Sequence, residues 1–413
     1  METESDSTMR RTGRLQVRVY AGNEGNPITG ASVRIAEPVG GPPLMELLTD
    51  IAGRTPLVEL SAPPERLSLQ PQTYEKPYAE YDVFVTAPGF HPVRAEGVQL
   101  FAGNTAIQRI PLQRQEFLNL KSLDIYIPPH TLWGVYPRKI PEAERKQLLA
   151  KGQQLSIPET VTVHLGAPDE VAETVSVPFK EYIKNVASCA VYPTWPAESL
   201  RANLLAILSF TLNRIFTDWY RRRGYAFTIT SSTAYDQAFA YGRNTYENIS
   251  VLVEELFTTY ITRPGIGQPL LAQYCDGSRV SCPRWLEQWG SAVLPGEGMD
   301  ALSILRYYYG QNVFLEQAQR VENAEPFPGM VLKPGAYSSA VNKMEEQLNV
   351  ISERYIAIDR LAADGHFGVQ TTDVVRTFQT LFGLPVTGEV DFATWYKIQE
   401  IYADVKRAEE ASA

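Results

Sequence analysis

The sequence contains no long hydrophobic run. No stretch reaches the roughly 18 uninterrupted apolar residues that suggest a transmembrane helix. The longest apolar helix expected, over 204–216, is interrupted by polar residues, namely Ser209, Thr211, Asn213 and Arg214. The opening residues, METESDSTMRRTGR, also lack the apolar core of a secretory signal. We therefore expect neither a membrane span nor a signal peptide in the chain as given.

The sequence also lacks an excess of positive charge. It has 38 Lys and Arg residues against 47 Asp and Glu, a formal net charge of −9. Nucleic acid is therefore not an expected partner, because binding to phosphates needs a basic surface. With 44% hydrophobic and 21% charged residues among 413, the composition is that of an ordinary globular protein with two to four domains.

Cysteine and histidine are scarce, which bears on disulfides and metals. The three cysteines are too few and odd in number for a disulfide scaffold. Cys275 and Cys282 bracket the polar loop DGSRVS, and either a disulfide or two reduced thiols would fit there. No histidine lies near this pair in the sequence, so zinc is not expected. We expect no metal and no cofactor. The four histidines are His91, His130, His164 and His366.

Short alternating runs dominate the first part of the chain. LQVRVY, ASVRIAE, YDVFVTA and TAIQRIPL alternate with period two and are separated by turn residues, which predicts an antiparallel β-sandwich over 12–113. The turns in NPITGASVRI, TDIAGRTPLVEL and YDVFVTAPGFHPV resemble those of carboxypeptidase-regulatory or transthyretin-like domains. That resemblance implies a spacer or adhesion unit. Residues 114–155 mix prolines with a short charged helix and are interpreted as a linker.

Two further domains are expected after the linker. Over 156–322, strands in ETVTVHLG and ETVSVPF precede helices from FKEYIKNVA, from Glu198 to Arg223, and from about Ile249 to Ile261, which predicts an α+β domain. Over 334–405, three apolar stripes at helical spacing predict a three-helix bundle. The stripes are Met344, Leu348, Ile351 and Tyr355, then Val374, Val375, Phe378 and Leu381, then Phe392, Trp395, Ile398 and Ile401.

Six segments of the central domain occur in the order of one known family. VPFKEYIKNVAS, VYPTWPAESLRAN, FTITSSTAYDQAFAYGRN, QYCDGSRVSC, EQWGS and ILRYYYG resemble the stage II sporulation protein D family, and most closely the clostridial spore-cortex-lytic enzymes. The resemblance implies a lytic transglycosylase. Such an enzyme cleaves between N-acetylmuramic acid and N-acetylglucosamine without water and leaves a 1,6-anhydro sugar. One carboxyl group serves first as the acid and then as the base.

The expected catalytic acid is missing from this chain. In the family a glutamate stands five residues before the Trp of the Trp-Pro pair, where this chain has Ala190. Losing a positioned general acid costs roughly 10²- to 10⁴-fold in rate, so the chain is predicted to be inactive. Glu198, on the first turn of a helix, is expected to complement the helix dipole rather than replace the acid. An introduced change and a natural loss both explain Ala190, and the intact surrounding motif favours the introduced change.

The other candidate residues each have a structural alternative. Serines and threonines either bind sugar hydroxyls or cap a turn, and glutamines either bind acetamido groups or lie on a helix surface. An aspartate orients a hydroxyl or braces a loop, and aromatic rings stack on sugars or fill the core. The predicted substrate-binding residues are Tyr192, Trp195, Ser231, Ser232, Thr233, Gln237, Asp276, Gln288 and Trp289.

A second resemblance covers the C-terminal bundle. DGHFGVQTTDVVRTFQTLFGLPVTGEVDFATW, within about Val341 to Tyr402, resembles the peptidoglycan-binding domain 1 family through its DG-x-FG-x-x-T turn and its FQ-x-x-x-GL-x-x-x-G helix end. The resemblance implies binding to stem peptides and glycan. Phe367, Phe378 and Trp395 are expected in the core.

Together these patterns predict a protein of the cell wall or spore cortex. The expected function is a peptidoglycan lytic transglycosylase, acting on spore cortex during germination and silenced in this chain at Ala190. Its expected partners are glycan strands and stem peptides, with an activating protease as a further hypothesis. The alternative is a non-catalytic peptidoglycan-binding or scaffolding protein, including one within a wall-penetrating assembly.

Overall fold

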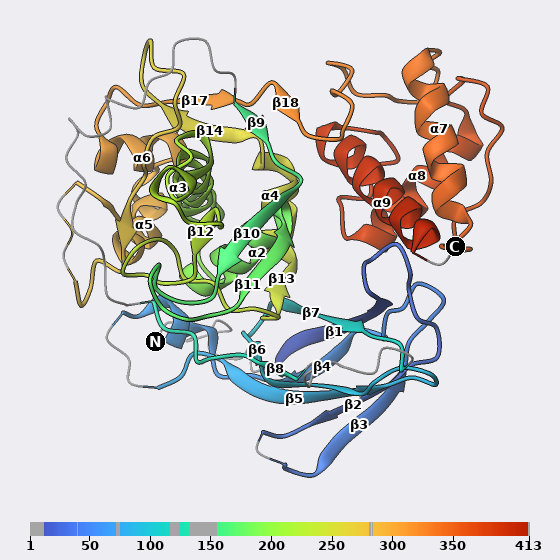
Figure 1. Cartoon of the computed structure of the whole chain (residues 1–413), viewed down its shortest axis with the longest axis horizontal. Coiled ribbons are helices and arrows are strands. Elements are labelled where there is room, and N and C mark those ends of the chain that lie inside the picture. Colours follow the sequence, from blue (N-terminus) through green and yellow to red (C-terminus); the bar gives the residue numbers. More distant parts are fainter. Residues whose placement is uncertain are drawn as a thin grey trace, which may run out of the picture.

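Three parts make up the chain in the computed structural model, which describes residues 12–38, 40–71, 75–115, 124–132, 155–280, 282 and 284–411. A strand-rich part (blue in Figure 1) lies below a mixed central part (green through yellow to light orange), and a helical part (orange to red) lies beside the central part and above one end of the strand-rich part. Within these described ranges, no helix has the length and apolarity needed to cross a bilayer.

The N-terminal part is built from two facing sheets. One has the strand order β13-β7-β1-β4 and the other β3-β2-β5-β6-β8. Inward-facing residues such as Leu15, Val17 and Val19 are almost fully buried. The elements are β1 (Thr12–Ala21), β2 (Ser32–Ala36), β3 (Pro43–Leu48), β4 (Val58–Ser61), η1 (Glu65–Leu69), β5 (Ala79–Thr86), β6 (Val93–Leu100), β7 (Thr105–Leu112) and β8 (Ile125–Tyr126).

These sheets are mixed, whereas the sequence predicted a purely antiparallel sandwich. β1 pairs in parallel with β7, from Arg14 opposite Thr105 to Ala21 opposite Leu112. The intervening chain crosses to the other sheet and back, so the last long strand returns beside the first in the same direction. Period-two alternation indicates which face of a strand is buried, but it does not indicate its neighbour or direction.

Part of the predicted linker belongs to the sandwich. β8 pairs in parallel with β6, with Ala95 opposite Ile125. The side chain of Gln99 donates a hydrogen bond to the Pro128 carbonyl at 3.0 Å, and His130 is buried. Residues 116–123 and 133–154 of the predicted linker lie outside the described residues.

The central part combines helices with short strand pairs. α3 is its longest helix and is buried over most of its length. α4 ends at Leu256, and Thr259–Thr262 form a strand paired with β17, where the sequence predicted helix to Ile261. The β-branched residues of TYIT favour this strand. The elements are β9 (Ser156–Ile157), β10 (Thr160–His164), β11 (Thr174–Pro178), α2 (Phe179–Ala190), α3 (Ala197–Phe216), η2 (Arg221–Arg223), β12 (Ile229–Thr230), β13 (Thr245–Tyr246), α4 (Glu247–Leu256), β14 (Thr259–Thr262), β15 (Tyr274–Cys275), β16 (Leu286–Glu287), α5 (Gln288–Val293), η3 (Leu294–Glu297), α6 (Ala301–Tyr309), β17 (Phe314–Gln317) and β18 (Arg320–Val321).

The C-terminal part contains the helices α7 (Ser339–Ser352), α8 (Val369–Phe382) and α9 (Phe392–Glu410), in agreement with the predicted helical region. Side chains of Met344, Val375 and Ile398, one from each predicted stripe, are at most 1% exposed. Ser338 caps α7 and Asp391 caps α9 through side-chain oxygens that accept main-chain N–H groups. The helical periodicity therefore located this part correctly.

The sandwich and the central part share a sheet. β13 of the central part pairs with β7, with Thr245 opposite Ile107. The Trp195 indole donates a hydrogen bond to the Ser68 carbonyl at 3.0 Å, from the Trp-Pro motif to η1 of the sandwich. The sandwich is thus continuous with the part that carries Ala190.

Candidate functional site

Ala190 lies at the C-terminal end of α2 and lines a cavity of about 40 Å³. Of the predicted substrate-binding residues, Thr233, Gln237 and Gln288 line the same cavity. These side chains come from segments that are up to 98 residues apart in the chain, and the fold brings them to one place.

Two sets of polar contacts fix the segment that carries Thr233 and Gln237. Asn185 of α2 donates to the Ala240 carbonyl at 2.7 Å and accepts from the Ala240 N–H at 3.1 Å. Earlier in the segment, Arg214 of α3 forms a buried ion pair with Asp236 at 2.7 Å. Both helices therefore hold this segment against the end of α2.

The two predicted glutamines at the cavity, Gln237 and Gln288, already have protein partners. Gln237 accepts hydrogen bonds from the Tyr182 and Thr211 hydroxyls, at 3.1 and 2.8 Å, and donates to the Ile207 carbonyl at 3.2 Å. Gln288 donates to the Ala190 carbonyl at 2.6 Å. These bonds connect α2, α3 and α5, so both amides serve the packing of the domain.

Asp236 is the carboxylate among the described residues that line the cavity, and it is fully engaged. Besides the Arg214 ion pair, it accepts from the Tyr220 hydroxyl at 2.6 Å and from the Thr230 N–H at 2.9 Å. Both oxygens of this carboxylate are therefore occupied by donors within the protein, and neither is directed at a substrate. The cavity as it stands therefore lacks, among its described residues, a group that could protonate a glycosidic oxygen.

The predicted serines and Asp276 lie in turns. The main-chain N–H of Ser231 donates to the His164 carbonyl, and the Ser232 carbonyl accepts from Asp236. Asp276 accepts from the main-chain N–H groups of Arg279 and Val280, at 2.6 and 3.2 Å. Asp276 thereby braces the 276–280 loop, and substrate binding by these residues stays a prediction.

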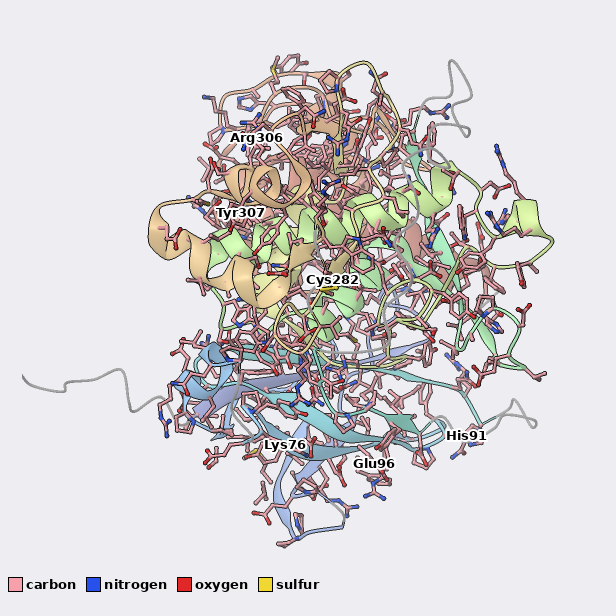
Figure 2. All side chains as sticks on the ribbon, turned by 90° about the vertical axis from the view of Figure 1, so that its left-hand side faces the viewer. Lys76, His91, Glu96, Cys282, Arg306 and Tyr307 are labelled. Carbon is pink, nitrogen blue, oxygen red and sulfur yellow. A yellow bond between two sulfur atoms is a disulfide. The ribbon has the colours of Figure 1, made fainter. Side chains whose placement is uncertain are left out.

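A disulfide closes the same loop. Cys275 and Cys282 are bonded to each other, with their Cα atoms 6.4 Å apart (Figure 2). Trp285, which lines the cavity, packs with both cysteines in a small apolar cluster. Through Trp285, this disulfide cluster reaches the wall of the cavity.

The predicted aromatic residues pack against one another. Tyr192, Trp195 and Trp289 form a cluster whose ring centroids lie 5.0 to 5.8 Å apart. Tyr192 and Trp195 are buried, and Trp289 is half-buried. Since Trp195 also bonds to Ser68, its present role is to join the central part to the sandwich.

The cavity also includes residues that sequence reasoning missed. Thr131 and Leu132 come from the predicted linker, and Cys189 precedes Ala190 directly. Burial raises the pKa of the Cys189 thiol, so it is held as an inert thiol. The position of Cys189 next to Ala190 in the sequence could have indicated that it belongs to the site. Nothing local in the sequence flagged residues 131–132, because their position depends on the pairing of β8 with β6.

An exposed apolar surface occurs on the C-terminal part. Tyr337 is 78% exposed and Val369 is 80% exposed. Tyr337 forms an isolated β-bridge with His366, which places it beside the DGHFG turn, and Val369 is the first residue of α8. The turn itself is fixed by the Gly365 N–H, which donates to the buried Glu345 carboxylate at 3.0 Å.

Comparison with known proteins gives one family. Residues 338–398 match the family described as "Putative peptidoglycan binding domain". This range begins at the cap of α7 and ends within α9. The C-terminal part is therefore similar to peptidoglycan-binding domains, and no curated protein matches the chain.

Similarity to solved structures is weak. The chain is similar to the Bacillus anthracis TIE protein (12% identity, 25% of this chain, 18% of that chain, TM-score 0.19). It is also similar to GBS52, the minor pilin of Streptococcus agalactiae (14% identity, 27% of this chain, 48% of that chain, TM-score 0.19). A third similar structure is the chlorocatechol 1,2-dioxygenase of Pseudomonas putida (14% identity, 27% of this chain, 63% of that chain, TM-score 0.16). The chain spans less than two thirds of each of these proteins, and the scores carry no conclusion about function.

Proposed function

We propose that this protein binds peptidoglycan through its C-terminal part and carries, in its central part, a lytic-transglycosylase site that Ala190 silences. The observation that carries the first half is the match of residues 338–398 to peptidoglycan-binding domains. The second half rests on the position of Ala190 in the cavity, together with the resemblance of the surrounding motifs.

The surroundings of position 190 suit a general acid. The side chain is 5% exposed and sits at the C-terminal end of α2. Burial and the negative end of the helix dipole both disfavour a carboxylate, so a glutamate placed here would have a raised pKa. A carboxyl group that keeps its proton near neutral pH is what protonation of a leaving oxygen requires.

Restoring the acid tests this half of the proposal. Purified spore cortex and vegetative sacculi are digested with the chain that carries Ala190, with Ala190→Glu and with Ala190→Gln, and released muropeptides are analysed by mass spectrometry. We expect 1,6-anhydro products from Ala190→Glu at about 10²-fold or more above the background measured with the chain that carries Ala190. Ala190→Gln has nearly the same size without the acid and should release none. Equal release by the glutamate and glutamine variants, or none by either, would contradict a silenced transglycosylase.

Wall binding has its own test on the exposed apolar surface. Tyr337 lies beside the DGHFG turn, where an aromatic ring is free to stack on a sugar or a peptide. We expect Tyr337→Ala to lower the fraction of protein that pellets with sacculi. The control is Tyr126→Ala, on β8 of the sandwich, where the tyrosine is 67% exposed. If both variants pellet like the wild type, the surface around Tyr337 is not the binding site.

A purely scaffolding protein is the second candidate. The observation in its favour is that the side chains of Gln237 and Gln288 are occupied by internal hydrogen bonds. Under this alternative, Ala190→Glu stays inactive while all variants with an intact C-terminal part still bind sacculi. The digestion and the pelleting experiment therefore separate the two candidates.

A further inference from the structure

A second cavity, of about 20 Å³, lies between the sandwich and the C-terminal part. Arg18 of β1 and Arg54 line its sandwich side, and Leu381 and Phe382 of α8 line the other. Arg18 and Arg54 are direct cross-strand neighbours in an isolated antiparallel bridge. Like charges at such positions repel each other, so this pair is unfavourable unless an anion accompanies it.

Neither guanidinium group is matched by a carboxylate of the described residues. Arg18 donates from Nε to the Gln16 side chain at 3.2 Å, and no described ion pair within 4.0 Å includes Arg18 or Arg54. Arg54 Nη1 donates to the Leu381 carbonyl at 2.9 Å, while its buried Nε has no hydrogen-bond partner among the described residues. A buried donor without a partner is rare and points to a missing acceptor.

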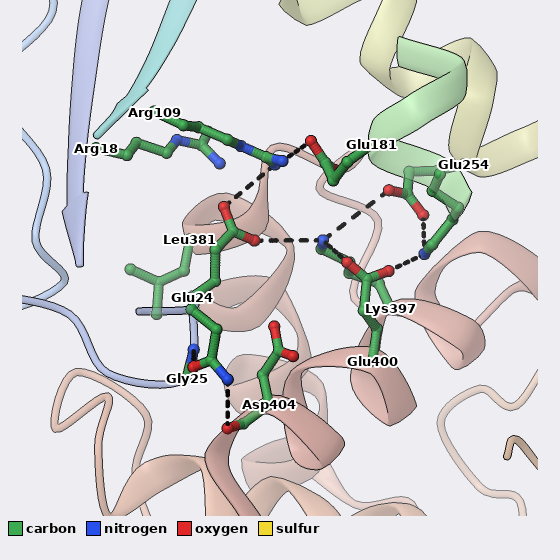
Figure 3. A network of polar contacts seen from close by, with 12 residues as sticks. Arg18, Glu24, Gly25, Arg109, Glu181, Glu254, Leu381, Lys397, Glu400 and Asp404 are labelled. Carbon is green, nitrogen blue, oxygen red and sulfur yellow. Dashed lines mark hydrogen bonds and ion pairs between the residues drawn. The ribbon is translucent and has the colours of Figure 1, made fainter. Parts of the chain in front are cut away.

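Glu24 also lines this cavity, but other cations engage it. One of its oxygens lies 3.2 Å from Arg109 and the other 3.7 Å from Lys397 (Figure 3). Its charge is therefore shared among cations from two parts of the chain. Burial lowers the pKa of Arg18 to about 10; Glu24 opposes this shift, and Arg109 and Arg54 add to it. The residues that line the cavity thus carry two positive charges and one negative charge, and Asp50, outside the lining, opposes the lowering of the Arg54 pKa by burial.

We propose that Arg18 and Arg54 bind a carboxylate group, of a free organic acid or of a peptide, at the junction of the sandwich and the C-terminal part. Planar guanidinium groups match the two oxygens of a carboxylate. A cavity of about 20 Å³ is large enough to admit a small planar headgroup. The apolar wall formed by Leu381 and Phe382 suits the carbon atom to which the carboxylate group is attached. Because two parts of the chain line the site, the bound carboxylate stabilises their contact.

Acetate titrated into the full chain at constant ionic strength tests this site. We expect the Tm of the wild type to rise with acetate, and Arg18→Gln to weaken the apparent affinity about tenfold or more, because a charge-assisted bond is lost. The matched control is Arg14→Gln, an exposed arginine on the same strand and the same face of β1. Arg14→Gln should respond to acetate like the wild type.

The outcomes separate a site from a general salt effect. An equal rise in all three proteins, or no rise in any, overturns the proposal. If Arg18→Gln does not fold, calorimetric titration of the wild type decides: one saturable acetate site per chain supports the proposal, and no saturable heat contradicts it. N-acetyl-alanyl-alanine and its amide then identify the source. Binding of the free acid but not of the amide shows that a peptide carboxylate enters, and binding of acetate alone restricts the site to small acids.

Discussion

At the scale of single residues, His130 is the most unusual group of the structure. Its ring lies among Tyr78, Phe101 and Tyr192, with centroids 4.9 to 6.3 Å away. Neither ring nitrogen has a hydrogen-bond partner of good geometry among the described residues. Burial lowers the pKa of His130 well below its ordinary value; Arg243 adds to this, and the Cys189 backbone partly opposes it. The folded protein therefore holds a neutral imidazole here.

This histidine predicts a pH-dependent stability. The unfolded chain takes up a proton at His130 near pH 6.5 and the folded chain does not, so stability falls as the pH drops below that value. The slope contributed is at most about 1.4 kcal/mol per pH unit. Burial raises the pKa of Asp404 to about 6, which acts in the opposite direction below that pH. His130→Phe should remove only the histidine contribution, as measured by urea denaturation between about pH 7.5 and 5, a window that spans the histidine's unfolded pKa. Identical slopes in both proteins would refute this assignment.

The sequence motifs pointed to some residues of the candidate site, but not to the hydrogen bonds that these residues form. Ala190 and Gln288 were both predicted from motifs, and the fold joins them by a hydrogen bond. The role of Trp195 could not be predicted, because an indole suits a sugar face and a carbonyl partner equally well. Only the position of Ser68, more than a hundred residues earlier, decides between them.

At the scale of elements, Gln379 explains why the FQ-x-x-x-GL-x-x-x-G pattern contains a glutamine. Its side-chain oxygen accepts from the N–H groups of Thr387 and Gly388, both at 2.9 Å. Its amide donates to the Glu389 carbonyl at 2.8 Å and to the Thr394 hydroxyl at 3.1 Å. One side chain therefore ties α8 to the following turn and to α9.

Replacing this glutamine should destabilise the C-terminal part. Gln379→Leu leaves the Gly388 N–H without an acceptor, whereas the Thr387 N–H keeps the Pro385 carbonyl at 3.0 Å, so the expected cost is about 1–3 kcal/mol. Gln370→Leu, a less buried position on the same helix, is the control and should change stability by at most about 0.5 kcal/mol. Urea denaturation followed by circular dichroism measures both. A loss below about 1 kcal/mol in Gln379→Leu, less than one unsatisfied buried group costs, would show that the turn holds without its side-chain partner.

Element type was easier to predict than element pairing. The spacing of Met344, Leu348 and Ile351 fixes the buried face of α7 locally, because residues three and four apart share a helix face. Which strand pairs with a given strand, in contrast, depends on segments that are far away in the sequence. β7 joins β1 on one side and β13, from the central part, on the other, and no local pattern in TAIQRIPL indicates either.

At the scale of the whole molecule, a buried charge network joins all three parts (Figure 3). Lys397 of α9 lies 2.7 Å from Glu400, 3.7 Å from Glu24 of the sandwich and 4.0 Å from Glu254 of α4. Lys184 of α2 lies 2.7 Å from Glu254. Buried ion pairs add little net stability but strongly penalise arrangements that separate them. In the sequence these residues resemble ordinary charges on helix surfaces, so the network could not be predicted.

Gly25 marks a close approach of the sandwich to the C-terminal part. A Cβ at this position would lie 2.3 to 2.4 Å from main-chain atoms of Asp404 and Val405. Gly25→Ala should therefore loosen the contact, increase the radius of gyration in X-ray scattering and lower the Tm. Gly267→Ala, where a Cβ meets nothing within 4 Å, is the control and should match the wild type. If Gly25→Ala scatters like the control, the two parts are not held at this contact.

The central claim is that the chain as it stands holds peptidoglycan without cutting it. The measurement that tests it most directly is co-sedimentation of the chain with Ala190 with purified sacculi, with the supernatant analysed for muropeptides. We predict that the protein pellets with the sacculi and that no 1,6-anhydro products are released. Protein that stays in the supernatant, or release of such products by the chain with Ala190 in place, would contradict the account.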